Sequence, residues 1–135
     1  MKGPGCLWAA GAFLGLLLIG YVSMRILQPE RLASMNHCIG AYADAEPPLQ
    51  NICDQPVNTE LCLYGKSGKD ICRTRSLAPG EGFDRQAIAA DLAQLGGLLR
   101  AEKYACKPPH MPGTVQDMNT KRMKKGCLPE GQTRN

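Results

Sequence analysis

The chain has 135 residues, a formal net charge of +4 and an aromatic content of 5%. A chain of this length holds one domain and additional segments, and so small a domain is marginally stable unless disulfides, a metal ion or a partner support it. Seven cysteines are available for that purpose. The few aromatic residues and the modest charge argue against a nucleic-acid-binding protein, which needs basic residues interleaved with stacking aromatics.

The N-terminal segment is the most apolar part of the chain. The stretch from Cys6 to Met24 carries no charge, and at about 1.5 Å per residue it can span a hydrocarbon core of about 30 Å. A cleaved signal peptide is the alternative, but Tyr21-Val22-Ser23 places a bulky residue where cleavage requires a small one. We therefore predict that residues 1–26 form a membrane anchor or uncleaved signal with a single transmembrane helix.

The remaining cysteines indicate on which side of a membrane the rest of the chain lies. Six of them follow the apolar segment, namely Cys38, Cys53, Cys62, Cys72, Cys106 and Cys127. An even set of cysteines in a small domain is typical of disulfides formed in an oxidising compartment, although spacing alone does not choose their pairing. We therefore predict a single-pass protein of the bacterial cytoplasmic membrane whose C-terminal domain is periplasmic.

A β-hairpin is the clearest local structure after the linker, which we place at residues 27–50. Apolar and polar residues alternate from Val57 to Tyr64, as in a half-buried strand, and the return strand is predicted at residues 71–76. If Cys62 lies opposite Cys72, a three-residue loop remains, and Gly68 occupies the position that requires a left-handed conformation.

One helix and one further strand are predicted after the hairpin. Asp84 can cap a helix in which Ile88, Leu92 and Leu95 form one apolar stripe, and two glycines end it. Residues 98–106 alternate again and stop before a pair of prolines, as expected of a strand. The fold class is therefore mainly β with one inserted helix (α+β), a small antiparallel domain stabilised by disulfides and preceded by the transmembrane helix.

The C-terminal residues 109–135 contain several prolines and glycines without apolar periodicity, so we predict an irregular tail. A basic cluster near its end consists of Lys121, Arg122, Lys124 and Lys125. A solvated tail is the simpler interpretation of this cluster. Contact with an anionic surface such as phospholipid headgroups is the alternative.

Residues 51–108 resemble small exported bacterial domains of unknown function. The resemblance lies in a shared skeleton of Cys, Pro-Val, Cys, Cys, Leu-x-Pro-Gly-Glu and Cys, which this chain matches at Cys53, Pro56-Val57, Cys62, Cys72, Leu77-Ala-Pro-Gly-Glu81 and Cys106. It implies a compact β-rich module with Cys62 bonded to Cys72 and Cys53 bonded to Cys106. Cys38 and Cys127 would then pair with each other.

No constellation of residues indicates catalysis or metal binding. The chain has no CxxC or Gly-x-Ser-x-Gly motif, and its two histidines, His37 and His110, are far apart in the sequence. The carboxylates that could be paired, Asp84 with Asp91 and Glu60 with Asp70, are predicted to be solvated at the surface. We therefore predict no catalytic, cofactor-binding or metal-binding residues and a protein that is not an enzyme.

These observations favour a non-enzymatic accessory or interaction protein, a small subunit of a larger envelope complex. Its predicted partners are membrane lipid, through the N-terminal helix, and other envelope proteins, with no cofactor and no nucleic acid. The alternative is a soluble secreted binding or inhibitor module, which requires cleavage of the N-terminal segment.

Overall fold

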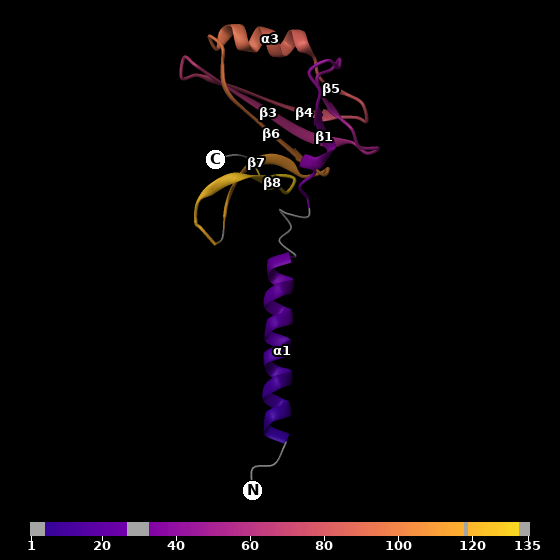
Figure 1. Ribbon diagram of the computed structural model, residues 1–135, viewed down its shortest axis with the longest axis vertical. Coiled ribbons are helices and arrows are strands. Elements are labelled where there is room, and N and C mark those ends of the chain that lie inside the picture. Colours follow the sequence, from indigo (N-terminus) through magenta and orange to yellow (C-terminus); the bar gives the residue numbers. More distant parts are fainter. Residues whose placement is uncertain (1–4, 27–32, 118, 133–135) are drawn as a thin grey trace. The chain divides into compact units, whose positions relative to one another are not determined.

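The computed structural model describes residues 5–26, 33–117 and 119–132, drawn in colour in Figure 1. The chain divides into two compact units, Met1–Leu32 and Ala33–Asn135. The first unit contains one described element, helix α1 (Gly5–Ile26). The second unit is a disulfide-bonded, mainly β domain with one α-helix, which confirms the coarse fold class.

Helix α1 presents apolar side chains to its surroundings. Between positions 13 and 22 its large exposed hydrophobic residues are Phe13, Leu14, Leu16, Leu17, Leu18, Ile19, Tyr21 and Val22. Within the described parts of the chain, no helix has the length and apolar character needed to cross a membrane. The predicted N-terminal helix is thus present, but the membrane span predicted for it is not supported.

Three antiparallel sheets make up the part of the domain that the structure describes. The central sheet has the strand order β4-β3-β6 and consists of β3 (Val57–Gly65), β4 (Asp70–Leu77) and β6 (Leu98–Cys106). The second sheet has the order β1-β2-β5 and consists of β1 (Ile39–Ala41), β2 (Leu49–Asn51) and β5 (Gly82–Phe83). The third is the hairpin of β7 (Met111–Gln116) and β8 (Met123–Leu128). The domain also contains the 3-10 helix η1 (Asn36–Cys38) and the helix α3 (Arg85–Gln94).

The predicted β-hairpin is confirmed, including its register. Strand β3 pairs with β4 so that Cys62 lies opposite Cys72, and the two form a disulfide. Gly68 has a φ of 82°, the left-handed conformation that the short loop requires. Leu61 and Leu63 lie in the hydrophobic core, and Ile71 packs against it, because the alternation of a strand places them on the opposite face from the cysteines.

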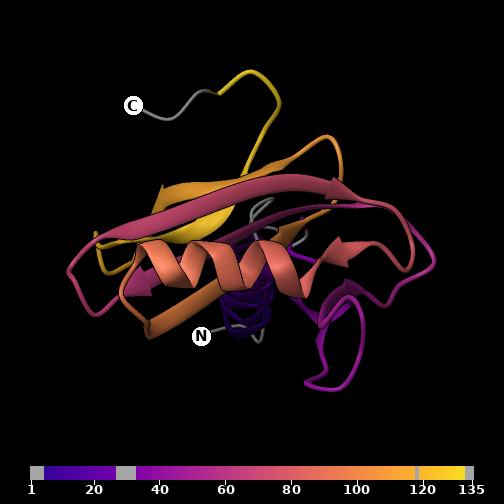
Figure 2. The same cartoon turned by 90° about the horizontal axis from the view of Figure 1, so that it is seen from above.

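The predicted helix and the strand after it are also confirmed. Asp84 caps α3, since its side chain accepts a hydrogen bond from the backbone N–H of Ala87 at 2.6 Å. The helix ends before Gly96 and Gly97, which both have positive φ. Figures 1 and 2 show α3 over one side of the central sheet, where the apolar stripe of the helix faces the core, and Figure 1 shows β7 and β8 on the other side.

The irregular tail predicted for residues 109–135 is wrong. This part of the chain contains the β7–β8 hairpin, in which Gly113 pairs with Gly126. A Cβ on Gly113 would collide with the side chain of Leu128, and one on Gly126 would collide with Val115. The glycines that suggested irregular structure are therefore the residues that let the two strands pack.

The linker predicted at residues 27–50 is also wrong from residue 33 onward, while residues 27–32 lie outside the described chain. The segment after residue 33 belongs to the domain, and it extends the central sheet at the end of β6. The backbone N–H of Met35 donates to Ala105 at 2.8 Å, and that of Lys107 donates to Ala33 at 2.7 Å. These hydrogen bonds provide partners for backbone N–H and C=O groups at the edge of the sheet, so they hold the segment in place.

Three disulfides are present, as expected from the six cysteines, but two of the pairings implied by the resemblance are wrong. Neither Cys53–Cys106 nor Cys38–Cys127 forms. The bonds are Cys38–Cys53, Cys62–Cys72 and Cys106–Cys127, with Cα–Cα distances of 5.1, 4.0 and 5.6 Å. The antiparallel pairing of β1 with β2 brings Cys38 close to Cys53. The β7–β8 hairpin places Cys127 beside Cys106 at the end of β6.

Candidate functional site

Strand β3 is buried on both faces, and one face carries a charged residue. Glu60 points away from the core and is 1% exposed. The ammonium group of Lys125, on β8, donates a hydrogen bond to a carboxylate oxygen of Glu60 and lies 3.8 Å from the sulfur of Cys62. This pair closes the space between the central sheet and the β7–β8 hairpin. The prediction that Glu60 is a solvated surface group is wrong, because the hairpin covers it.

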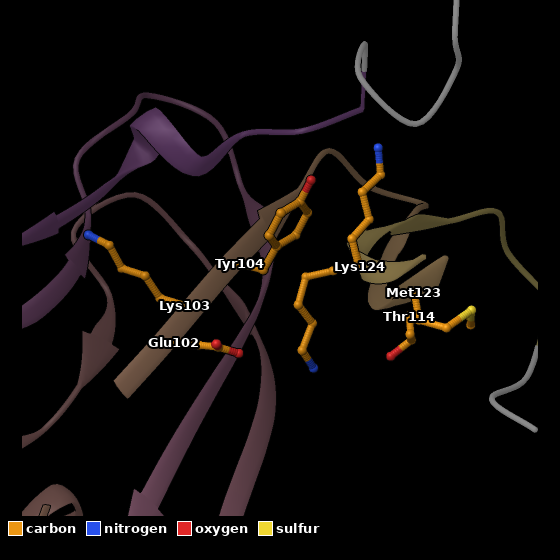
Figure 3. A pocket seen from close by; sticks show the side chains of 7 residues that line it. Glu102, Lys103, Tyr104, Thr114, Met123 and Lys124 are labelled. Carbon is orange, nitrogen blue, oxygen red and sulfur yellow. The ribbon is translucent and has the colours of Figure 1, made fainter. Parts of the chain in front are cut away.

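A groove of about 490 Å³ lies beside this buried pair (Figure 3). Strand β6 and the β7–β8 hairpin line it with Glu102, Lys103, Tyr104, Thr114, Met123, Lys124 and Lys125. It combines an aromatic ring, a thioether and charges of both signs. Such a lining suits contact with a mixed polar and apolar surface, and it lacks a nucleophile oriented by a base.

The lysines of the groove are engaged with acceptors of the domain. Lys103 donates to the carbonyl oxygen of Ile39 at 2.8 Å, and in Figure 3 its side chain points away from Tyr104. Lys124 donates to Asp117 at 2.8 Å, and Lys125 donates to Glu60. Since each ammonium group already has an oxygen partner, these lysines hold the hairpin and its surroundings together.

The predicted basic cluster is therefore divided between two roles. Lys124 and Lys125 form ion pairs within the domain, whereas Lys121 and Arg122 lie exposed at the tip of the β7–β8 hairpin. Asp117 organises that tip, because it accepts hydrogen bonds from Lys124 and from two backbone N–H groups of the turn. The hydrogen bond from Lys124, followed by those from the backbone, holds the pKa of Asp117 far below its ordinary value.

A second buried carboxylate connects the inserted helix to the central sheet. Asp91, on α3, is buried, and its two oxygens accept hydrogen bonds from Nε and Nη2 of Arg73, each at 2.5 Å. These hydrogen bonds outweigh the effect of burial and lower the pKa of Asp91. The prediction that Asp91 is a solvated surface group is wrong. The other carboxylates considered with it, Asp70 and Asp84, are exposed.

The sequence contained a readable signal for Asp91. It lies three residues after Ile88 and four before Leu95, so helical spacing places it on the apolar stripe that faces the core. Glu60 lies on the face of β3 opposite to the core residues Leu61 and Leu63, so alternation predicts that it is exposed. That face is buried because β8 lies against it. A local pattern could thus have predicted the first buried carboxylate and not the second.

Among the described residues, one group has the proximity that metal binding requires. The ligand atoms of His37, Cys38 and Cys53 all lie within 4.8 Å of one another. The two cysteines are joined in a disulfide, and a disulfide sulfur is not the thiolate that ligates a metal ion. As long as that bond is intact, His37 lacks thiolate partners there.

Comparison with known protein families, curated proteins and solved structures finds no match to this chain. The function of the chain is therefore inferred from its own residues. They provide a disulfide-bonded domain, a groove of polar and apolar side chains beside β6, an exposed basic hairpin tip and an apolar helix.

Proposed function

We propose that the chain is a non-enzymatic interaction protein of the bacterial envelope, whose disulfide-bonded domain binds a larger protein assembly. The observation that carries this proposal is the pairing of all six cysteines that follow the apolar segment. Disulfides form and persist in oxidising compartments, and in small domains they replace part of the stability that a large core would give. The likeness to small exported bacterial domains belongs to the same proposal.

Helix α1 supplies the attachment in this proposal. Its exposed leucines and aromatic side chains are unfavourable in water, so lipid or an apolar partner surface has to cover them. We infer that α1 holds the chain at the cytoplasmic membrane with the domain on the periplasmic side. Attachment of this kind raises the effective concentration of the domain near partners in the same membrane.

The contact surface of the domain is the groove beside β6 together with the neighbouring hairpin tip. The strands that carry this surface are joined by the Cys106–Cys127 disulfide and by the ion pair of Lys125 with Glu60, so the backbone loses little conformational entropy when a partner binds. Tyr104 and Met123 offer apolar contact area, and Lys121 and Arg122 offer charge. A partner with an acidic rim around an apolar centre fits this combination.

Fractionation of bacterial cells that produce the full chain tests the attachment. The chain should stay with membranes after washing at alkaline pH, and alkylation without reductant should label none of the six paired cysteines. Replacing Leu17 by Arg should release the chain, whereas Leu17→Ile should not, because only the first change places a charge in the apolar helix.

Three results would contradict the proposal. Soluble chain with an intact N-terminus would argue against attachment through α1. Soluble chain that has lost the N-terminal segment, as shown by intact mass, would favour the secreted binding or inhibitor module instead. Free thiols at Cys38, Cys53, Cys106 or Cys127 would contradict an oxidising location.

A further inference from the structure

The three disulfides differ in how far they are shielded from solvent. Cys106 and Cys127 are 0% and 1% exposed, and Cys38 is fully buried beside the half-buried Cys53. The Cys62–Cys72 bond has two unlike ends, because Cys62 is buried whereas Cys72 is exposed. A reagent in solution therefore meets this disulfide first, and it meets the Cys72 end.

The backbone around Cys72 is accessible as well. Strand β4 is an edge strand of the central sheet, and no described strand pairs with its outer side. The backbone N–H of Gly65 donates to the carbonyl oxygen of Lys69, so these two residues form a hydrogen-bonded pair of the hairpin. Along antiparallel strands such pairs alternate with pairs that share no backbone hydrogen bond. Counted along β3 and β4, Cys62 and Cys72 are a non-hydrogen-bonded pair. The N–H and C=O of Cys72 thus face outward, where an extended segment of another protein can pair with them.

The charges around the disulfide distinguish its two sulfurs. The ammonium group of Lys125 lies 3.8 Å from the sulfur of Cys62, and it has enough N–H donors to serve this sulfur and Glu60 together. A carboxylate oxygen of Asp70 lies 4.0 Å from the sulfur of Cys72. A thiolate is stabilised beside a cation and destabilised beside an anion. When the bond breaks, Cys62 is the better leaving group.

We propose that Cys62–Cys72 is a thiol–disulfide exchange site opened by an external dithiol, such as two neighbouring cysteines of a redox protein. One thiolate of the dithiol attacks the sulfur of Cys72, the bond to Cys62 breaks, and its electron pair leaves with Cys62. The second thiolate then attacks the dithiol's own sulfur in the mixed disulfide and releases Cys72. The dithiol is oxidised to a disulfide, and its two protons end on the cysteine thiols.

This site does not depend on the proposed function in the envelope, since it rests on the disulfide, the edge strand and Lys125. It would make one of the three disulfides reversible while the other two keep the domain folded. After opening, the Cys106–Cys127 bond and the ion pair of Lys125 with Glu60 would still join β8 to the central sheet.

Limited reduction of the oxidised full chain tests the order of opening. Dithiothreitol is added for increasing times, the reaction is stopped with acid, and free thiols are alkylated and located by peptide mass spectrometry. Cys62 and Cys72 should be labelled well before the other four. If the Cys38–Cys53 or Cys106–Cys127 bond opens first, or if all three open together, the proposal is wrong.

A monothiol tests the direction of attack. With glutathione as the probe, the trapped intermediate should carry glutathione on Cys72 and the alkylating label on Cys62. The reverse distribution, or an equal mixture of both adducts, would overturn the assignment of Cys62 as the leaving sulfur.

Replacing Lys125 tests the leaving-group role. To avoid a buried unpaired carboxylate, the variant combines Lys125→Met with Glu60→Gln, and it should slow the opening of Cys62–Cys72 at least about threefold. A merely structural role would give the opposite result, because a loosened domain is reduced faster. The single variant Lys125→Arg keeps a cation at this position and should keep most of the wild-type rate of Cys62–Cys72 opening. Lys124→Met, which affects a different ion pair, should leave that rate unchanged.

The rate at which Cys38–Cys53 opens in the same samples serves as an internal control for folding. A change confined to Cys62–Cys72 supports the proposal. An unchanged rate in the double variant, or parallel acceleration of both bonds, contradicts it.

Discussion

Asp91 and Glu60 are carboxylates on opposite sides of the central sheet, and each holds an outer element against it. Asp91 binds the inserted helix to Arg73 on the edge strand, whereas Glu60 binds the C-terminal hairpin through Lys125. Buried charges are tolerated only when they are paired and hydrogen-bonded. Because each pair joins two elements of the domain, a change in either pair is expected to alter the stability of the domain.

Replacing Asp91 by Asn should destabilise the domain by about 1 to 3 kcal/mol, because Arg73 loses a charged partner. Folding lowers the pKa of Asp91, so the stabilisation is present above the unfolded-state pKa of about 4 and disappears as the pH falls through the folded-state value. The difference between wild type and variant should therefore shrink in acid. Denaturant unfolding at several pH values measures it, with Asp54→Asn, an exposed carboxylate, as the control.

A double-mutant cycle on Glu60 and Lys125 should show strong coupling. Lys125→Met alone leaves a buried carboxylate without its cation and should cost about 3 to 5 kcal/mol. Adding Glu60→Gln removes that charge and should recover much of the stability. The free energies of unfolding of the two single variants and the double variant decide the matter, and additive losses would show that the two groups act independently.

Elements defined by neighbouring residues could be predicted from the sequence. Turn chemistry and alternation predicted the β3–β4 hairpin with its register, and a capping aspartate with an apolar stripe predicted α3. The β7–β8 hairpin was missed because its strands contain Pro112, Gly113 and Gly126, and the fit of the two glycines depends on side chains of the opposite strand. The sequence alone left the disulfide pairing open, and the resemblance implied wrong partners for two of the bonds, since the pairing of distant strands decides which cysteines meet.

The glycine pair of the β7–β8 hairpin permits a direct test of that packing. Gly126→Ala should destabilise the domain by about 1 to 3 kcal/mol, because the added methyl group collides with Val115. The compensating change Val115→Ala, made in the same chain, should recover part of the loss by making room. Thermal unfolding of the single and double variants provides the measurement. If Gly126→Ala alone has no effect, the two strands do not pack as closely as the structure has them.

At the scale of the whole molecule, the chain combines an apolar helix with a domain in which several charged side chains form ion pairs with one another. The four basic residues of the C-terminal region looked equivalent in the sequence. The ion pairs of Lys124 and Lys125 leave Lys121 and Arg122 as the exposed cations of the hairpin tip. The spacing of these residues in the sequence does not show which of them form ion pairs, because that depends on where Asp117 and Glu60 lie in the folded domain.

Reversing the charge of the hairpin tip should therefore weaken association without unfolding the domain. In the full chain purified from native membranes, Lys121→Glu with Arg122→Glu should reduce the co-purifying proteins at low salt, and the difference should vanish at high salt, where exposed charges are screened. The matched control is Lys66→Glu with Lys69→Glu, which changes the net charge equally at the exposed turn between β3 and β4. Equal losses in both variants would indicate an effect of net charge alone. An unchanged set of co-purifying proteins in the tip variant at low salt would show that the tip is only a solvated turn.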